Sequence, residues 1–124
     1  MIRGFRGATT VNGNIEAEIT KETKKLVLTM VETNEIKPED ISHVLFSVTN
    51  DLNASFPAKV AREMNGWTHV PVMCMKEIDV PNSLPLCIRV MMVARTELKQ
   101  NEVQHIFLNE AIKLRPDLVG NEGD

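Results

Sequence analysis

Arg89 stands in the middle of an apolar run of the sequence, Leu86 to Thr96 (LCIRVMMVART). The length of the run and its β-branched and thioether side chains favour a buried strand. On a strand, Arg89 shares one face with Cys87, Met91 and Val93. An unpaired buried cation would cost several kcal/mol, so we expect Arg89 to have anionic partners. These partners could come from the protein, from a ligand or from both.

Other basic residues also fall in apolar or structured segments, although the chain is acidic, with a formal net charge of −3. They are Arg6, Lys59, Arg62 and Arg115. Arginine forks bind carboxylates and phosphates through paired hydrogen bonds. Because the sequence has no glycine-rich phosphate loop, carboxylates are the better match. The spacing alone therefore indicates a small ligand with several negative charges.

Hydrolytic and metal-dependent chemistries have weak support in the sequence. His43, His69 and His105 lie in predicted strands and form no HExxH or HxH pattern, so we expect no metal site. The chain also lacks a GxSxG motif, a P-loop and a dinucleotide fingerprint. A nucleophilic pair of Cys74 with a histidine stays open as an alternative, without a local signature to support it.

The composition is that of an ordinary globular domain, with 43% hydrophobic and 25% charged residues among 124. We expect one domain over residues 1–118 and a loose polar tail over residues 119–124. The absence of long charge blocks and the 4% aromatic content argue against nucleic-acid and membrane partners. The two cysteines match no metal or redox spacing, and no signal peptide is visible, which favours a cytoplasmic location.

The elements that must position the basic residues follow from hydrophobic periodicity. Strands are predicted at residues 1–11, 41–49, 67–75, 86–96 and 103–108. Helices are predicted at residues 15–34, with Asn14 as N-cap, and at residues 57–65, ended by Gly66, with a short turn or helix at residues 109–118.

This order indicates an α+β (α/β-like) fold, in which a mixed sheet is covered by one long helix plus short helices. Pro71 cannot donate a hydrogen bond to a ladder, so the strand at residues 67–75 should lie at a sheet edge or a subunit boundary. The sheet face that the long helix does not cover is too apolar to stay in water. We therefore expect the chain to form an oligomer.

Four sequence blocks resemble the monofunctional chorismate mutases of the Bacillus type. They are RGFRGATTV (residues 3–11), FPAKVAREMNGW (56–67), PVMCMKEIDVPNSLPLCIRVM (71–91) and LRPDL (114–118). The match runs from Ile2 to Leu118 with the blocks in the same order. The resemblance implies a ferredoxin-like or chorismate-mutase-like chain whose sheets form a pseudo-α/β barrel in a homotrimer. It also implies active sites between subunits, and conversion of chorismate to prephenate without a cofactor, on the route to phenylalanine and tyrosine.

That reaction would explain the basic residues, because it is an intramolecular Claisen rearrangement that transfers no proton. Negative charge grows on the ether oxygen of chorismate as its C–O bond breaks, and a fixed cation there stabilises the transition state more than the ground state. The resemblance assigns this part to Arg89. It also implies that Arg6 binds the substrate from the sheet floor, and that Glu77 meets the ring hydroxyl beside Cys74.

The resemblance implies further pocket residues, and two of them depart from the family pattern. Phe56 and Ala58 would be walls, Lys59 and Arg62 an anion-binding edge from a neighbouring subunit, Val72 and Met73 part of the lining, and Leu114 and Arg115 a flap. Phe107 stands where a tyrosine is common, and Met73 where a smaller polar residue is usual. The missing hydroxyl should weaken binding by about 0.5–1.5 kcal/mol without abolishing function.

Two other functions stay open. One is an imine/enamine deaminase of the reactive-intermediate type, a small trimeric enzyme of similar architecture, although its motifs are not found in this chain. The other is a non-enzymatic trimer that binds an aromatic-pathway metabolite, because a fold does not determine a function.

Overall fold

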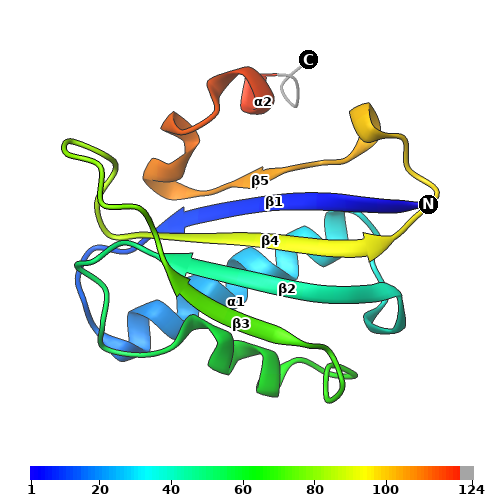
Figure 1. Cartoon of the computed structure of the whole chain (residues 1–124), viewed down its shortest axis with the longest axis horizontal. Helices are drawn as coiled ribbons and strands as arrows, with labels where there is room; N and C mark the ends of the chain where they lie inside the picture. Colours follow the sequence, from blue (N-terminus) through cyan, green and yellow to red (C-terminus); the bar gives the residue numbers. More distant parts are fainter. Residues whose placement is uncertain (121–124) are drawn as a thin grey trace.

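The computed structural model describes residues 1–120 and contains a five-stranded mixed sheet with a long helix across one face (Figure 1). The strands are β1 (Ile2–Thr10), β2 (Ile41–Val48), β3 (Val72–Lys76), β4 (Cys87–Arg95) and β5 (Ile106–Phe107). The α-helices are α1 (Glu16–Thr33) and α2 (Pro116–Gly120), and the 3₁₀ helices are η1 (Pro38–Asp40), η2 (Pro57–Glu63), η3 (Gln100–Glu102) and η4 (Asn109–Lys113). The predicted α+β class, with one long covering helix, is confirmed.

The strand order is β3-β2-β4-β1-β5. The central strand β4 runs antiparallel to both β1 and β2, whereas β3 and β5 are parallel to their neighbours. The register places Arg89 in β4 opposite Ala8 in β1 and opposite Ser47 in β2. The strand that follows Pro71 lies at the sheet edge, as predicted. Arg89 therefore projects from the middle of the sheet.

Strand β4 alternates between the two faces of the sheet, as its sequence predicts. Ile88, Val90, Met92 and Ala94 are at most 3% exposed and belong to the core. Met91 is 37% exposed on the opposite face, which Arg89 shares. One face of the sheet is thus packed against α1, while the other carries the basic side chain and remains open in a single chain.

Helix α1 covers the sheet with an apolar stripe at helical spacing. Ile19, Leu26, Val27 and Met30 are fully buried. The prediction that Asn14 caps this helix is wrong, since Ile15 occupies the N-cap position without a side-chain hydrogen bond. The Asn14 side chain instead accepts hydrogen bonds from the backbone N–H groups of residues 53 and 54, at 3.0 and 2.9 Å. Asn14 therefore ties the start of α1 to the loop that leads to η2.

A clamp of hydrogen bonds sets the residue at which β4 begins. Leu86 has a φ of 51°, in the left-handed region that non-glycine residues seldom adopt. Its N–H donates to Oδ2 of Asp51 at 2.9 Å, and the N–H of Cys87 donates to Oγ1 of Thr49 at 3.0 Å. These bonds fix the entry of the strand three residues before Arg89.

Gly7 in β1 lies where the sheet and α1 approach each other most closely. A Cβ atom at this position would collide with Sδ of Met30 and come within 3.3 Å of Cδ1 of Leu26. We expect Gly7→Val to lower the free energy of unfolding by about 1–3 kcal/mol, the usual cost of overpacking a core. Urea denaturation measures this change. Gly13→Ala is the control, because a Cβ there meets its nearest neighbour at 3.7 Å. Equal stability of the two variants would contradict this account of the packing.

Several predicted boundaries are wrong. Residues 67–71 were expected to begin a strand, but the N–H of Val70 donates to the carbonyl of Trp67, and the strand starts only at Val72. Residues 103–108 contribute only the two-residue strand β5, and residues 109–118 divide between η4 and α2. Of the predicted loose tail, residues 119 and 120 belong to α2, and residues 121–124 lie outside the described part of the chain. Among the described helices, none has the length and apolar character needed to cross a membrane.

Candidate active site

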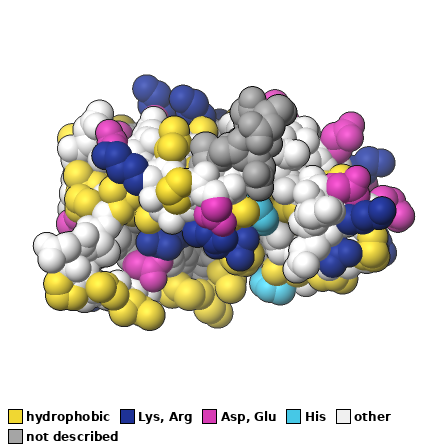
Figure 2. Space-filling view, turned by 90° about the horizontal axis from the view of Figure 1, so that it is seen from above, with side chains coloured by type: hydrophobic (Ala, Val, Ile, Leu, Met, Phe, Trp, Pro, Cys, Tyr) yellow, Lys and Arg dark blue, Asp and Glu magenta, His cyan; other side chains and the backbone are white. Residues whose placement is uncertain are grey.

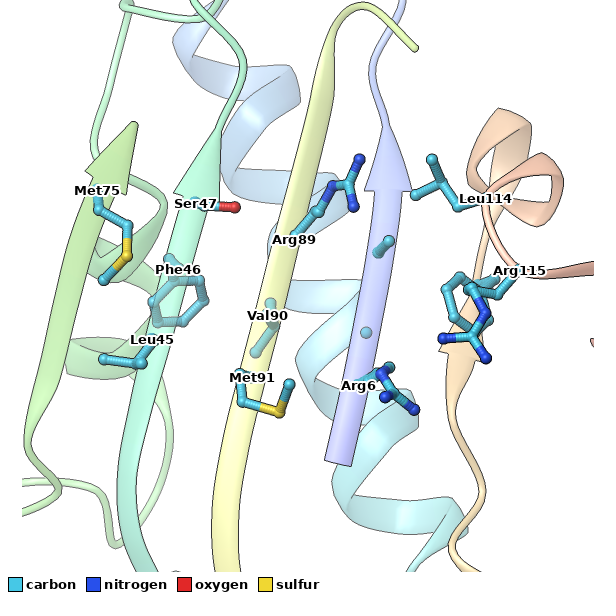
Figure 3. A pocket seen from close by; sticks show the side chains of 13 residues that line it. Arg6, Leu45, Phe46, Ser47, Met75, Arg89, Val90, Met91, Leu114 and Arg115 are labelled. Carbon is cyan, nitrogen blue, oxygen red and sulfur yellow. The ribbon is translucent and has the colours of Figure 1, made fainter. Parts of the chain in front are cut away.

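A pocket of about 340 Å³ opens on the sheet face that α1 does not cover (Figure 3). All five strands contribute to its lining, and the segment after η4 closes one side with Leu114 and Arg115. Three arginines, Arg6, Arg89 and Arg115, share this pocket with Phe107. In Figure 2, Lys and Arg side chains gather near the centre of the view, and hydrophobic side chains follow its lower left edge. The pocket thus combines a positive field with apolar walls.

Arg89 has the anionic protein partner that its sequence position predicts. Its Nε lies 3.1 Å from Oε2 of Glu77, in an ion pair whose side chains are 41% and 27% exposed. The Nε atom itself is buried and has no hydrogen-bond partner in the structure, so the contact with the carboxylate is electrostatic. Glu77 therefore contacts the guanidinium of Arg89 at Nε, the nitrogen bonded to the aliphatic part of the side chain.

Glu77 follows the last residue of β3 and is fixed on both of its oxygens. Oε1 accepts the N–H of Ile78 at 3.0 Å, and Oε2 accepts the hydroxyl of Ser47 at 3.3 Å. The backbone N–H of Glu77 also donates to the carbonyl of Val48 at 2.8 Å. The position of this carboxylate is thus set by the protein and does not depend on a ligand.

Arg6 and Arg115 line the other side of the pocket, and His105 lies next to Arg6 outside the pocket lining. The backbone N–H of Arg6 donates to Nδ1 of His105 at 2.9 Å, which requires this nitrogen to be unprotonated. Burial, together with the charges of Arg6 and Arg115, lowers the pKa of His105. Arg115 forms a bidentate ion pair with Asp117, with contacts of 3.1 and 2.9 Å. An incoming carboxylate would compete with Asp117 for this side chain.

A second pocket of about 620 Å³ lies between η2 and β3. It contains seven further residues that the resemblance named, which are Phe56, Ala58, Lys59, Arg62, Val72, Met73 and Cys74. Glu77 lines neither of these pockets and lies in a separate hollow formed with the loop after β3, from which it reaches Arg89. Lys59 reaches Glu16 at 3.2 Å, and Phe56 is 70% exposed. This pocket has a basic edge and an uncovered aromatic wall.

The predicted site residues therefore fall into two separate groups in one chain. Arg6, Arg89, Phe107, Leu114 and Arg115 line the first pocket, and no residue lines both. Cys74 was expected beside Glu77, but it lines the second pocket. The next residue, Met75, lines the first pocket, because successive side chains of a strand point to opposite faces of the sheet. A single chain does not bring the two groups together.

Neither cysteine has the properties of an activated nucleophile. Burial raises the pKa of Cys74 above its ordinary value of 9.0. Burial also raises the pKa of Cys87, although the nearby Arg89 charge acts in the opposite direction. Both thiols stay protonated at neutral pH, so the alternative of a Cys74 nucleophile gains no support. Within the described residues, no group of three His, Cys, Asp or Glu side chains could hold a metal ion.

Sequence reasoning missed several residues of the first pocket. Leu45, Ser47 and Met75 come from β2 and β3, and Met91 from β4. Their membership follows from strand register, because each lies on the same face as Arg89. Ser47, a polar residue between the apolar residues Phe46 and Val48, was the one available signal.

Comparisons with known proteins agree on one family. The sequence model of the family "chorismate mutase type I" matches residues 2–118. The chain is 51% identical to the chorismate mutase AroH of Bacillus subtilis over 118 residues, which cover 95% of this chain and 93% of the relative. It is 44% identical to the chorismate mutase AroH of Thermus thermophilus over 119 residues, which cover 95% and 97%.

Among solved structures, a chorismate mutase from Clostridium thermocellum superimposes with a TM-score of 0.84 at 50% identity. The match covers 87% of this chain and 96% of that structure. The two proteins therefore share the fold over most of this chain.

Proposed function

This chain belongs to the chorismate mutase type I family, and on that premise we propose that it converts chorismate to prephenate, a step toward phenylalanine and tyrosine. The observation that carries the proposed mechanism is the guanidinium of Arg89, held by Glu77 on the floor of a pocket with two further arginines. A dicarboxylate fits such a pocket, because arginine forks match carboxylates in geometry and charge.

We infer that the rearrangement is accelerated mainly by electrostatics. The reaction has a single reactant, so the large gain from bringing two molecules together does not apply. The site would select the folded conformer of chorismate in which the two reacting carbons are close. Since Glu77 engages Nε of Arg89, the two terminal nitrogens would donate to the ether oxygen and a carboxylate of the substrate. Charge on the ether oxygen grows only as its bond breaks, so this contact strengthens in the transition state.

The remaining residues of the first pocket would bind and enclose the substrate. Arg6 would approach it from the sheet floor, and Leu114 with Arg115 would cover it as a flap. Glu77 would meet the ring hydroxyl while it keeps its contact with Arg89. Phe107 offers an apolar surface and no hydroxyl, so affinity for the substrate should be lower than in a relative with tyrosine there.

We further propose that the active unit is a homotrimer, whose three sheets form a pseudo-α/β barrel, with each site shared by two subunits. The two groups of site residues lie in different pockets of one chain, which supports a site completed by a neighbour. The exposed apolar residues on the open face, Met73, Met75 and Met91, would become buried on assembly. Residues 1–118 would form the single catalytic domain, acting in the cytoplasm, where its two free thiols would remain reduced.

Turnover of chorismate tests the proposed function directly. The purified chain is incubated with chorismate, the loss of chorismate absorbance is followed, and prephenate is identified by NMR. Formation of prephenate is the expected result. Binding of chorismate without conversion would indicate the metabolite-binding alternative, and no binding at all would contradict the proposal.

The turnover number should be nearly independent of pH between about 6.5 and 9, since no proton is transferred in the reaction. Over this range the lowered pKa of His105 favours its neutral form, and the raised pKa values of Cys74 and Cys87 favour their protonated thiols. A bell-shaped profile of kcat with two limbs would contradict this prediction.

The stability of the protein should change on the acid side of this range. The unfolded chain binds a proton at His105 more readily than the folded chain does, because folding lowers the pKa of this residue. Its contribution to stability is therefore complete above pH 6.5 and is lost as the pH falls through the lowered pKa. Thermal unfolding recorded beside kcat separates this loss from an effect on the chemistry.

A further inference from the structure

A hydroxyl group lies between strands β2 and β4, next to the cation that the proposed function requires. Ser47 is paired with Arg89 across the two strands, and both residues line the first pocket. Figure 3 shows the side chain of Ser47 extending from β2 toward β4. Its neighbours in β2 are apolar, so a polar side chain here gains nothing from packing.

The contacts of Glu77 connect this hydroxyl to the cation. Ser47 donates to Oε2 of Glu77 at 3.3 Å, and the same oxygen lies 3.1 Å from Nε of Arg89. Because Nε of Arg89 forms no hydrogen bond, the ion pair alone leaves the angle of the carboxylate undetermined. That angle is set instead by Ser47 at one oxygen and by the N–H of Ile78 at the other.

We propose that Ser47 is a positioning residue for catalysis: its hydroxyl orients the Glu77 carboxylate, which in turn holds Arg89 where charge develops. This inference rests on the proposed function. The side chain of Arg89 is 41% exposed in one chain and has several rotatable bonds, so it needs an external constraint. A misplacement of about 1 Å can cost about 100-fold in rate. Loss of the constraint should lower kcat more than it changes KM, because Arg89 acts mainly in the transition state.

Two substitutions of similar shape isolate the hydroxyl. Ser47→Val removes the hydroxyl, whereas Ser47→Thr keeps it on a side chain of nearly the same volume as valine. We expect Ser47→Val to lower kcat about tenfold, with KM changed by less than about threefold, and Ser47→Thr to stay within about threefold of the wild type. Ser47→Ala replaces the valine variant if that protein does not fold. Ser42→Ala, at the exposed end of the same strand, is the control and should leave kcat unchanged.

The route through Glu77 is tested by repeating the substitution in a Glu77→Ala background. There the hydroxyl has no carboxylate to orient, so the double variant should have a kcat within about twofold of that of Glu77→Ala alone. A full tenfold loss in both backgrounds would mean that Ser47 acts directly on the substrate, and would overturn the inference. Equal kcat values for the valine and threonine variants would also overturn it.

The same experiment separates this inference from the function on which it rests. A wild-type protein that does not convert chorismate contradicts the proposed function itself. A wild-type protein that converts chorismate, while every Ser47 variant matches it, contradicts only the positioning role of Ser47.

Discussion

Replacement of Arg89 by alanine is expected to lower kcat by about 10²- to 10³-fold, the usual cost of losing one preorganised donor to a developing charge. The guanidinium projects from the middle of the sheet, and Glu77 holds it at Nε. Alanine removes the cation and leaves the rest of the pocket in place. Because the lost contact is made mainly in the transition state, kcat should fall more than KM rises. Steady-state kinetics with chorismate measures both.

Arg95→Ala is the matched control for this variant. Arg95 lies in the same strand and pairs with Asp40 at 3.0 Å, but it is exposed and lies outside the pocket. Its loss should leave kcat within about twofold, because Arg95 does not line the pocket. The protein should also stay folded, because an exposed ion pair contributes little to stability. A change of less than tenfold in Arg89→Ala, with the protein still folded, would reject the assigned role of Arg89.

Co-expression of two inactive variants should restore activity if each site is shared by neighbouring subunits. Arg89→Ala damages the first pocket, and Arg62→Ala damages the second. In a random mixed oligomer, about one site in four combines an intact first pocket from one chain with an intact second pocket from its neighbour. The mixture should therefore recover to about a quarter of wild-type activity. Activity per site, measured after co-expression in equal amounts, gives the result.

The control mixture combines Arg89→Ala with Arg6→Ala. Both residues line the same pocket of one chain, so every site contains one damaged residue and no activity should return. Recovery in both mixtures, or in neither, would contradict a site completed by a neighbouring subunit.

Local patterns in the sequence predict much of this fold. The alternation in Leu86 to Thr96 correctly groups the residues of β4 by face, and Pro71 correctly predicts an edge strand. That one face of β4 is open in a single chain was not predicted. The prediction fails for residues 67–71. Trp67 is buried and apolar, as in a strand, but its backbone is used in turn hydrogen bonds. Hydrophobic periodicity records burial, and it does not record which backbone groups are paired.

The candidate site was predictable in its charges and less so in its arrangement. The position of Arg89 in an apolar run calls for an anion, but the sequence alone does not select Glu77, twelve residues earlier across a loop. Strand alternation could have separated Cys74 from Glu77, since an odd spacing places side chains on opposite faces. Ser47 gave almost no signal, because its role depends on the register that pairs it with Arg89.

The kcat of an Arg89→Lys variant at saturating chorismate tests the central claim most directly. Lysine keeps the positive charge but loses the planar fork, whose Nε lies next to Glu77 and whose terminal nitrogens contact the substrate in the proposed mechanism. If a positioned guanidinium stabilises the charge on the ether oxygen, kcat should fall by about 100-fold or more while the protein stays folded. A lysine variant within about tenfold of the wild type would contradict that claim.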